Sequence, residues 1–269
     1  MRHSILSFLT ILLCGAALLD ARADAQTTLS IRDAVIGDSG QPAAEISTAE
    51  FSRVLADSSV TVLDARPYAE YAVGHIPGAR NVAPKPGVPP SAYVSDVAEI
   101  GRLLHNDHTA PVVLYCNGPH CGKSKRLAAE LVSAGYRNVR RYQLGMPVWR
   151  ALGGVCVIEL AGMRRVLSLD RTAVVIDTRP AASFAAGSLP QAQNIPRELV
   201  LAAKDTGEVR RAKDDGRLPM DDHNTRIVVV GRDAREARYV AEALAREAFD
   251  NVSYFPSSFE EARQGLRSK

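Results

Sequence analysis

Cys116 is the residue of this chain whose surroundings most clearly indicate chemistry. It follows the apolar run VVLY at 112–115, and a loop with glycine, proline and histidine separates it from a helical pattern over 125–133. A strand, a tight loop and a helix N-terminus together direct backbone N–H groups and the positive end of the helix dipole at the cysteine. These groups stabilise a thiolate over a thiol, so the pattern predicts a nucleophilic Cys116. The alternative is a buried cysteine that packs as a small hydrophobic residue at the end of a strand.

Short β-branched runs alternate with helical patterns around this cysteine. The expected strands cover 60–63, 112–115 and 139–142, and the expected helices cover 49–55 and 125–133. Such alternation predicts an α/β fold, a parallel sheet flanked by helices on both faces. Binding sites in these sheets lie beyond the carboxyl ends of the strands, where Cys116 is found. The proline-rich stretch 83–91 is expected to be a surface loop.

The chain contains an internal repeat. Residues 64–82 align without a gap on residues 177–195, at a constant offset of 113. Identical positions include Asp64/Asp177, Arg66/Arg179, Pro67/Pro180, Gly74/Gly187, Pro77/Pro190, Ala79/Ala192 and Asn81/Asn194. The similarity continues where the run 112–116 matches 227–231. The chain is therefore predicted to consist of two copies of one domain.

The first 25 residues have the pattern of a secretory signal peptide. Arg2 precedes an apolar stretch over 5–19, and Ala23-Asp24-Ala25 has the small-x-small form of a signal peptidase site. An uncleaved anchor is the alternative, but the apolar stretch is shorter than the roughly 20 residues that a spanning helix needs. Cleavage after Ala25 predicts a periplasmic or secreted protein with no stable membrane insertion.

Charge and cysteine content narrow the class of protein further. The formal net charge is only +3, and basic residues alternate with acidic ones, as in 210–215, so nucleic-acid binding is not expected. After signal cleavage the chain keeps Cys116, Cys121 and Cys156, in a compartment that permits disulfides. An odd number of cysteines leaves at least one free thiol, and Cys156 lies near no motif.

The motifs, taken in order, resemble those of the rhodanese-like sulfurtransferases. They are Asp64-x-Arg66, the segment GHIPGA at 74–79, the strand that ends in Tyr115-Cys116, and the closing segment GMPVW at 145–149. The resemblance covers both copies, about residues 45–152 and 157–265. It implies two tandem rhodanese-like domains, each a parallel sheet with helices on both faces.

The resemblance also implies a reaction. Cys116 would attack the outer sulfur of a small anionic donor such as thiosulfate, carry that sulfur as a persulfide, and pass it to cyanide or a thiol, for example of a thioredoxin-like acceptor. No cofactor or metal is implied. Loop N–H groups would face the terminal sulfur, and side chains at the helix start would add positive charge. The expected substrate-binding residues are Asn117, Gly118, His120, Gly122, Lys123 and Ser124.

Other family-motif residues are expected to support the fold. An aspartate at a strand end beside an arginine more often ties a loop through charge-assisted hydrogen bonds, which is the role expected for Asp64 and Arg66. His75 is expected to pack and to form hydrogen bonds. Trp149 is expected in the core.

Two departures from the family pattern affect the prediction. Gly231 stands at the position of Cys116 in the second copy, so that copy is expected to be catalytically silent. Asn138 lies 22 residues after Cys116, whereas Asn251 lies 20 after Gly231, so the first copy's loop is two residues longer. The donor preference of compact-loop rhodaneses therefore does not carry over directly.

Cys121, five positions after Cys116, has two interpretations. In an oxidising compartment it can resolve a sulfenate or persulfide on Cys116 by forming a disulfide across the loop, which makes the site redox-switchable. Alternatively, it packs under the loop as an unreactive thiol. The sequence leaves both open.

Three other functions compete with sulfur transfer. A phosphatase or arsenate-type enzyme also places a cysteine in an anion loop, but Gly122, Lys123 and Ser124 stand where such chemistry needs an arginine. A metal site of Cys116, His120 and Cys121 matches no standard zinc spacing. A non-catalytic or redox-sensing module that binds sulfur species is a different class, and turnover in a Cys116→Ser variant separates it from an enzyme.

Overall fold

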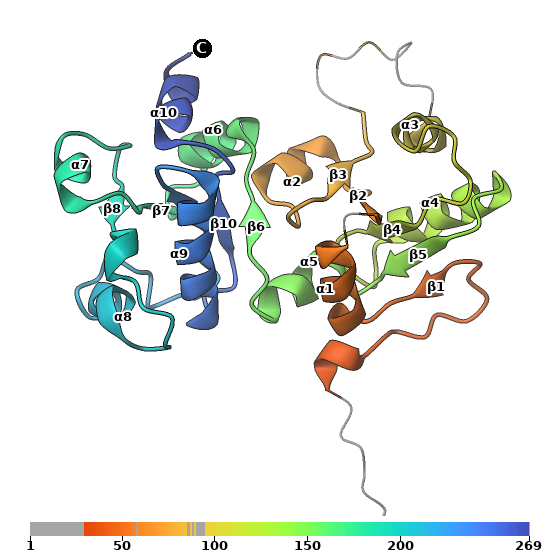
Figure 1. Cartoon of the computed structure of the whole chain (residues 1–269), viewed down its shortest axis with the longest axis horizontal. Helices are drawn as coiled ribbons and strands as arrows, with labels where there is room; N and C mark the ends of the chain where they lie inside the picture. Colours follow the sequence, from red (N-terminus) through yellow and green to blue (C-terminus); the bar gives the residue numbers. More distant parts are fainter. Residues whose placement is uncertain (1–29, 58, 85–86, 88, 90–94, 269) are drawn as a thin grey trace, which may run out of the picture.

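Two parallel five-stranded sheets, one in each copy of the repeat, make up the protein (Figure 1). The computed structural model describes residues 30–57, 59–84, 87, 89 and 95–268. The predicted signal peptide and most of the stretch 83–91 lie outside these residues. The strand orders are β1-β5-β4-β2-β3 and β6-β10-β9-β7-β8. The predicted α/β fold and its duplication are confirmed.

The first sheet carries the predicted strands of the N-terminal copy. Its strands are β1 (Ala44–Glu45), β2 (Thr61–Asp64), β3 (Arg80–Asn81), β4 (Val112–Tyr115) and β5 (Val139–Tyr142). Its helices are α1 (Thr48–Ala56), α2 (Tyr68–Val73), α3 (Asp96–Leu103), α4 (Gly122–Ser133) and α5 (Gly145–Ala151), after a 3-10 helix η1 (Ile31–Asp33). The expected bounds of β4 and β5 are confirmed, while α4 begins three residues earlier than its apolar pattern.

Strand β4 is buried on both faces, which explains its uninterrupted apolar sequence. Val112 and Leu114 pack in one core cluster with residues of α4, and Val113 and Tyr115 pack in another with Phe51 of α1. This alternation places α4 on one face of the sheet and α1 on the other. The strand that leads to Cys116 is thus held from both sides.

The second sheet repeats the arrangement. Its strands are β6 (Cys156–Val157), β7 (Val174–Asp177), β8 (Gln193–Asn194), β9 (Ile227–Val230) and β10 (Val252–Tyr254). Its helices are α6 (Leu160–Leu169), α7 (Ala181–Ala185), α8 (Gly207–Asp214), α9 (Ala234–Arg246) and α10 (Phe259–Arg267), with a 3-10 helix η3 (Arg197–Leu199). Asp64 pairs with Tyr115 in the first sheet as Asp177 pairs with Val230 in the second.

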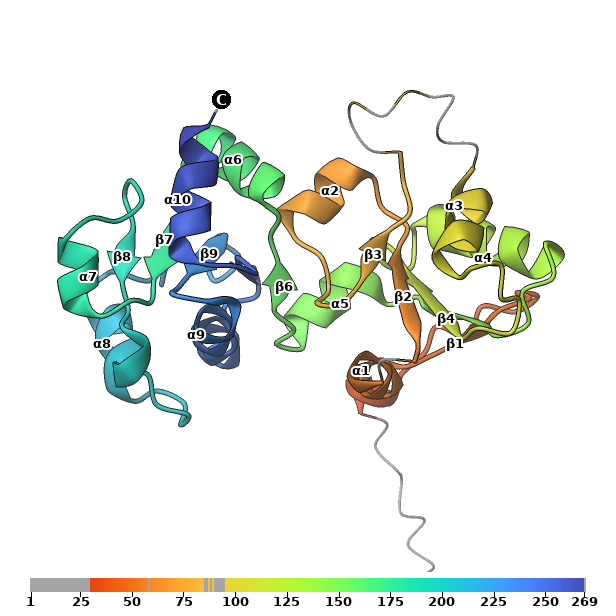
Figure 2. The same cartoon turned by 45° about the horizontal axis from the view of Figure 1, so that its top comes forward.

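The two copies meet along α2, α6 and β6, which lie side by side in both views (Figure 2). A Cβ on Gly162 of α6 would overlap the main chain at Ala72 of α2, so only glycine permits this approach. The main chain of His75 exchanges hydrogen bonds of 3.0 and 2.8 Å with Val157. Cys156, a free and fully buried thiol, packs with the core of the first copy. The copies therefore share packed surface.

No helix in the described part of the chain is long and apolar enough to cross a membrane.

Candidate active site

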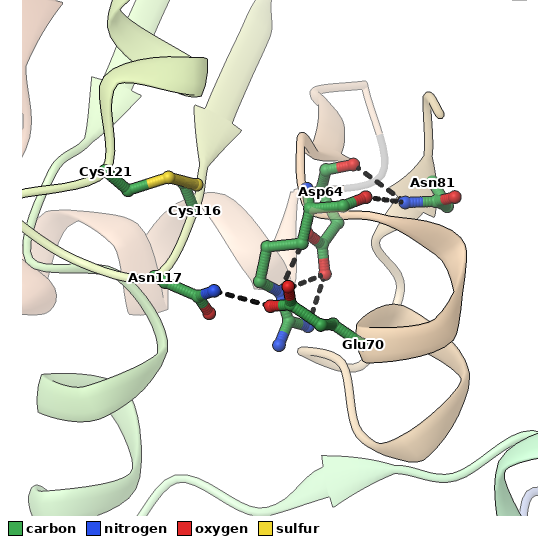
Figure 3. The surroundings of a disulfide bond; sticks show 7 residues. Asp64, Glu70, Asn81, Cys116, Asn117 and Cys121 are labelled. Atoms are coloured by element: carbon green, nitrogen blue, oxygen red, sulfur yellow. Dashed lines mark hydrogen bonds and ion pairs between the residues drawn. A yellow bond between two sulfur atoms is a disulfide. The ribbon is translucent and has the colours of Figure 1, made fainter. Parts of the chain in front are cut away.

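Strand β4 delivers Cys116 to the carboxyl edge of the first sheet, directly before the loop 117–121. Cys116 is 2% exposed, and Cys121, the residue before α4, is partly exposed. The two sulfur atoms are joined in a disulfide, with the Cα atoms 6.2 Å apart (Figure 3). Of the two interpretations of Cys121, the structure therefore supports the pair and not an isolated packed thiol.

Two glycines fix the path of this loop. Gly118 and Gly145 have φ of +98° and +61°, which L side chains rarely adopt. A Cβ on Gly145 would lie 2.5 Å from the nitrogen of Gly118 and closer still to the carbonyl oxygen of Cys116. The N–H of Met146 donates to that carbonyl over 3.1 Å, and the N–H of Cys121 donates to the carbonyl of Gly118 over 3.0 Å. Helix α5 thus buttresses the loop through backbone contact.

The structure brings the predicted substrate-binding residues together on the loop and the first turn of α4. Asn117, His120, Gly122 and Lys123 are exposed, whereas Gly118 and Ser124 are buried. Within the described residues, the side chains of His120 and Lys123 make no hydrogen bond or ion pair. Both side chains are therefore free to meet an anion. Their contact with substrate stays a prediction.

Two neighbouring cations are occupied elsewhere. Arg126 of α4 pairs with Glu130 over 3.3 Å on the outer face of the helix. Lys125 donates to Asp38 over 3.1 Å, which ties the N-terminal segment to α4. Fewer basic side chains are therefore available to an anion at the loop than the run of basic residues suggests.

Glu70 of α2 contacts the loop and is not among the residues expected from the sequence. The side-chain amide of Asn117 donates to its carboxylate (Figure 3). The order of the strands explains this contact. Because β2 and β4 are parallel neighbours, α2, which follows β2, lies beside the loop that follows β4. Glu70 orients Asn117 and places a negative charge next to the site.

A buried hydrogen-bond network anchors the strand end that precedes Cys116. The hydroxyl of Tyr115 donates to Asp64 over 2.7 Å and accepts from the N–H of Ile76 over 3.1 Å. Burial, with the nearby charge of Asp64, raises the pKa of Tyr115 well above its usual value and keeps the hydroxyl protonated. Arg66 pairs with Asp64 and donates to the carbonyl of Gly74 over 2.8 Å. Although burial alone lowers the pKa of Arg66, the hydrogen bonds and charge of Asp64 raise it overall.

The second copy keeps this network without a cysteine at the end of the strand. Arg179 pairs with Asp177 over 2.7 Å and donates to the carbonyl of Gly187 over 2.8 Å. The hydroxyl of Ser188 donates to Asp177 over 2.6 Å, just as the hydroxyl of Tyr115 donates to Asp64 in the first copy. Because the network persists where no cysteine is present, it holds the fold. The expected structural role of the Asp-x-Arg motif is confirmed.

His75 faces the contact between the copies. Its Nδ1–H donates to the carbonyl of Tyr71 over 3.1 Å, and its ring stacks on the Tyr71 ring at a centroid distance of 3.8 Å. Burial lowers the pKa of His75 to about 4, so the ring is neutral at pH 7. The expected packing and hydrogen-bonding role is confirmed.

The space beside Gly231, which stands at the position of Cys116, is filled by other groups. A Cβ on Gly231 would lie 2.5 Å from the hydroxyl oxygen of Thr178. That hydroxyl donates to the buried carboxylate of Glu236 over 3.0 Å, and Arg232 donates to the same carboxylate over 2.7 Å. Under the offset of 113, Glu236 corresponds to Lys123. The second copy therefore lacks the space as well as the sulfur.

The described residues contain no group of three or more histidine, cysteine or acidic side chains arranged to hold a metal ion. The two thiols that such a site would need are bonded to each other.

The rhodanese-like domain family matches this chain twice, over residues 47–152 and 165–264. Each match covers four strands of one sheet and most of its helices, while the edge strands β1 and β6 lie just before the matched ranges. The chain belongs to the rhodanese-like family and contains two tandem rhodanese-like domains. The resemblance found in the motifs is confirmed.

Three relatives indicate the range of proteins to which the chain is similar. It is 28% identical over 268 residues to "Putative thiosulfate sulfurtransferase SseB" of Mycobacterium tuberculosis, covering 80% of this chain and 92% of that protein. It is 31% identical over 101 residues to thiosulfate sulfurtransferase GlpE of Pseudomonas fluorescens, covering 38% and 80%. It is 35% identical over 114 residues to the HTH-type transcriptional regulator Rv0324 of M. tuberculosis. That match covers 42% of this chain and 45% of the regulator, so the chain spans less than half of the regulator's length.

Proposed function

We propose that this protein is a rhodanese-type sulfurtransferase that carries sulfane sulfur as a persulfide on Cys116. The observation that carries the proposal is the position of Cys116, at the end of β4 and ahead of the N-terminus of α4. Loop N–H groups and the helix dipole at this position favour a thiolate and an anionic substrate. The names of two relatives, thiosulfate sulfurtransferases, agree with this chemistry.

The transfer has two steps. The thiolate of Cys116 attacks the outer sulfur of thiosulfate, the S–S bond of the donor breaks, and sulfite leaves with the bonding electron pair. A thiolate or cyanide then attacks the outer sulfur of the persulfide, and the Cys116 thiolate leaves. His120 and Lys123 lie free at the loop and attract the donor, while loop N–H groups stabilise the charge on the terminal sulfur.

The disulfide sets a condition for this activity. Cys116 cannot attack a donor while its sulfur is bonded to Cys121, so a reductant must first restore two thiols. The signal pattern over residues 1–25 supports a periplasmic or secreted location. There, a thioredoxin-like dithiol fits both as reductant and as sulfur acceptor.

The second copy is proposed to be catalytically silent and to support the first. Thr178 and Glu236 occupy the place of a nucleophile, and α6 packs directly against α2, whose Glu70 orients Asn117. Its contribution is therefore to the position of α2.

Thiocyanate formation by the reduced protein, given thiosulfate and cyanide, tests this proposal. The wild type is expected to gain one sulfur atom in its intact mass and to turn over. Cys116→Ser is expected to lose both properties, whereas the buried Cys156→Ala, outside the loop, keeps them. Reduced wild type that neither gains sulfur nor forms thiocyanate overturns the proposal.

The disulfide also supports a second candidate, a redox-sensing module. In that case oxidation of Cys116 and Cys121 is the signal, and the reduced protein has no turnover with any sulfur donor. A partner that binds only one redox state, recovered by comparing reduced with oxidised protein as bait, is the expected result. Equal binding of that partner to both states counts against it.

A further inference from the structure

Cys121 lies within bonding distance of the sulfur that would carry the persulfide. The structure shows the two sulfur atoms joined, so the loop already holds both Cα atoms in place for this bond. Cys121 occupies the N-cap position of α4, and its side chain makes no capping hydrogen bond there. It is instead turned toward Cys116 (Figure 3).

The longer loop of the first copy accommodates this contact. Helix α4 begins six residues after Cys116, whereas α9 begins three residues after Gly231. The additional residues form the turn through Gly118, whose φ of +98° and hydrogen bond from Cys121 lead the chain back over Cys116. The second copy has neither the turn nor a cysteine in this position. The extra length and Cys121 therefore belong to one feature.

We propose that Cys121 resolves the Cys116 persulfide and releases its outer sulfur as sulfide, so that the protein is also a dithiol-dependent sulfane reductase. This inference rests on the proposed persulfide. The thiol of Cys121 attacks Sγ of Cys116, and the new Sγ–Sγ bond forms as the bond to the outer sulfur breaks. The outer sulfur leaves as HS⁻ with the electron pair and the proton of Cys121. It is reduced to sulfide while the two cysteines are oxidised to the disulfide.

The surroundings favour the outer sulfur as the leaving group. Negative charge develops on that atom during the attack, and the N-terminus of α4, which begins directly after Cys121, lies beside the pair of sulfur atoms. Stabilising this charge lowers the barrier to the departure of the outer sulfur, because thiol–disulfide exchange is faster when the leaving sulfur carries negative charge more easily. The same groups that bind the donor anion thus promote release of HS⁻.

Regeneration requires a dithiol reductant of the thioredoxin class. Cys121 is partly exposed, whereas Cys116 is 2% exposed, so an external thiolate reaches Sγ of Cys121. Attack there forms a mixed disulfide with Cys121 and frees Cys116 as a thiolate. The second thiol of the reductant then releases Cys121. Each cycle converts one thiosulfate and one dithiol into sulfite, sulfide and a disulfide.

A single-turnover assay without external thiol tests this step. The protein is reduced, freed of reductant under anaerobic conditions, and mixed with one equivalent of thiosulfate. Wild type is expected to release one equivalent each of sulfite and sulfide and to lose two thiols. Cys121→Ser is expected to release sulfite, retain the added sulfur in its intact mass, and release no sulfide. Subsequent cyanide should convert the retained sulfur into thiocyanate, which shows that the variant is folded.

Two controls separate this inference from the proposed function. Wild type that releases sulfite but keeps a stable persulfide with no sulfide overturns the resolving role and leaves the sulfurtransferase standing. A parallel reaction loads Cys116 with inorganic polysulfide in place of thiosulfate. Sulfide release from wild type above that from Cys121→Ser in this reaction supports resolution even if thiosulfate fails as donor. Equal sulfide release from the two proteins overturns it.

Discussion

The hydroxyl of Tyr115 anchors the end of β4 directly before Cys116, its neighbour in the chain. It satisfies one buried acceptor, Asp64, and one buried donor, the N–H of Ile76, at the same time. A buried polar group that loses its partner costs about 1–3 kcal/mol. One hydroxyl therefore joins the end of β4 to the aspartate at the end of β2.

Tyr115→Phe tests this contact. It removes the hydroxyl and leaves Asp64 and the N–H of Ile76 without this partner, so the free energy of unfolding should fall by about 2–3 kcal/mol. Urea denaturation measures the loss. Thiocyanate formation by the reduced protein should fall as well, because the strand end that carries Cys116 is released.

Ser188→Ala is the matched control, since it removes the corresponding donor to Asp177 in the second copy. It should lower stability and leave thiocyanate formation intact. Equal loss of activity in both variants would show that activity follows global stability and not the local tie at Tyr115.

At the scale of elements, the site depends on how closely α5 approaches the loop between β4 and α4. The backbone at Gly145 passes so near to Cys116 and Gly118 that no side-chain atom fits. The loop is thus shaped from outside by a segment that follows it by more than twenty residues. Hydrogen bonds within the loop alone do not determine its path.

Gly145→Ala should displace the loop and abolish most sulfur transfer. The added methyl group meets the carbonyl of Cys116 and the nitrogen of Gly118, and the positive φ adds about 1–3 kcal/mol of strain. Thiocyanate formation and the rate at which a thiol reagent modifies reduced Cys116 measure the effect. Gly216→Ala has a similar φ of +81° and open space around its Cβ, so it controls for backbone strain alone. Activity in Gly145→Ala equal to that in Gly216→Ala would contradict the steric argument.

At the scale of the whole molecule, a histidine that is neutral at pH 7 lies where the two copies meet. His75 joins the first copy to Val157 through its main chain and packs its ring on Tyr71 in the same region. Glu159 lies 3.8 Å from its Nε2 and is more exposed than the ring. Burial nonetheless dominates and lowers the pKa of His75 to about 4.

Stability should therefore fall on acidification from about pH 6.5 toward pH 4. In this range the unfolded chain binds a proton on His75 that the folded protein does not bind, so protonation stabilises the unfolded state relative to the folded one. The stabilisation that the neutral ring provides is present at neutral pH, and about 2 kcal/mol of it should be lost between pH 7.5 and pH 5. Urea denaturation at a series of pH values measures this slope.

His75→Asn should flatten the slope, because its amide can donate to the carbonyl of Tyr71 and does not titrate. His223→Asn, in the second copy, serves as the control and should retain the slope. A slope that is unchanged in His75→Asn assigns the acid sensitivity to other groups.

Local pattern determined the architecture of this protein. Strands β4 and β5, the duplicated Asp-x-Arg motif and the place of Cys116 at a strand end follow from short-range periodicity and from the internal repeat, and the structure agrees with the predicted fold. The missing sulfur of the second copy is equally visible as Gly231. These features depend on residues close in sequence, where periodicity and turn chemistry are decisive.

Only the tertiary structure decided which groups meet. The pairing of Cys116 with Cys121, left open between two interpretations, depends on a loop path that Gly145 imposes from a later helix. Glu70 reaches Asn117 because β2 and β4 are neighbours in the sheet. Cys156, without a motif in the sequence, is buried where the copies meet. Such contacts join segments distant in the chain, and their geometry is set by sheet register and helix packing, which no local pattern specifies.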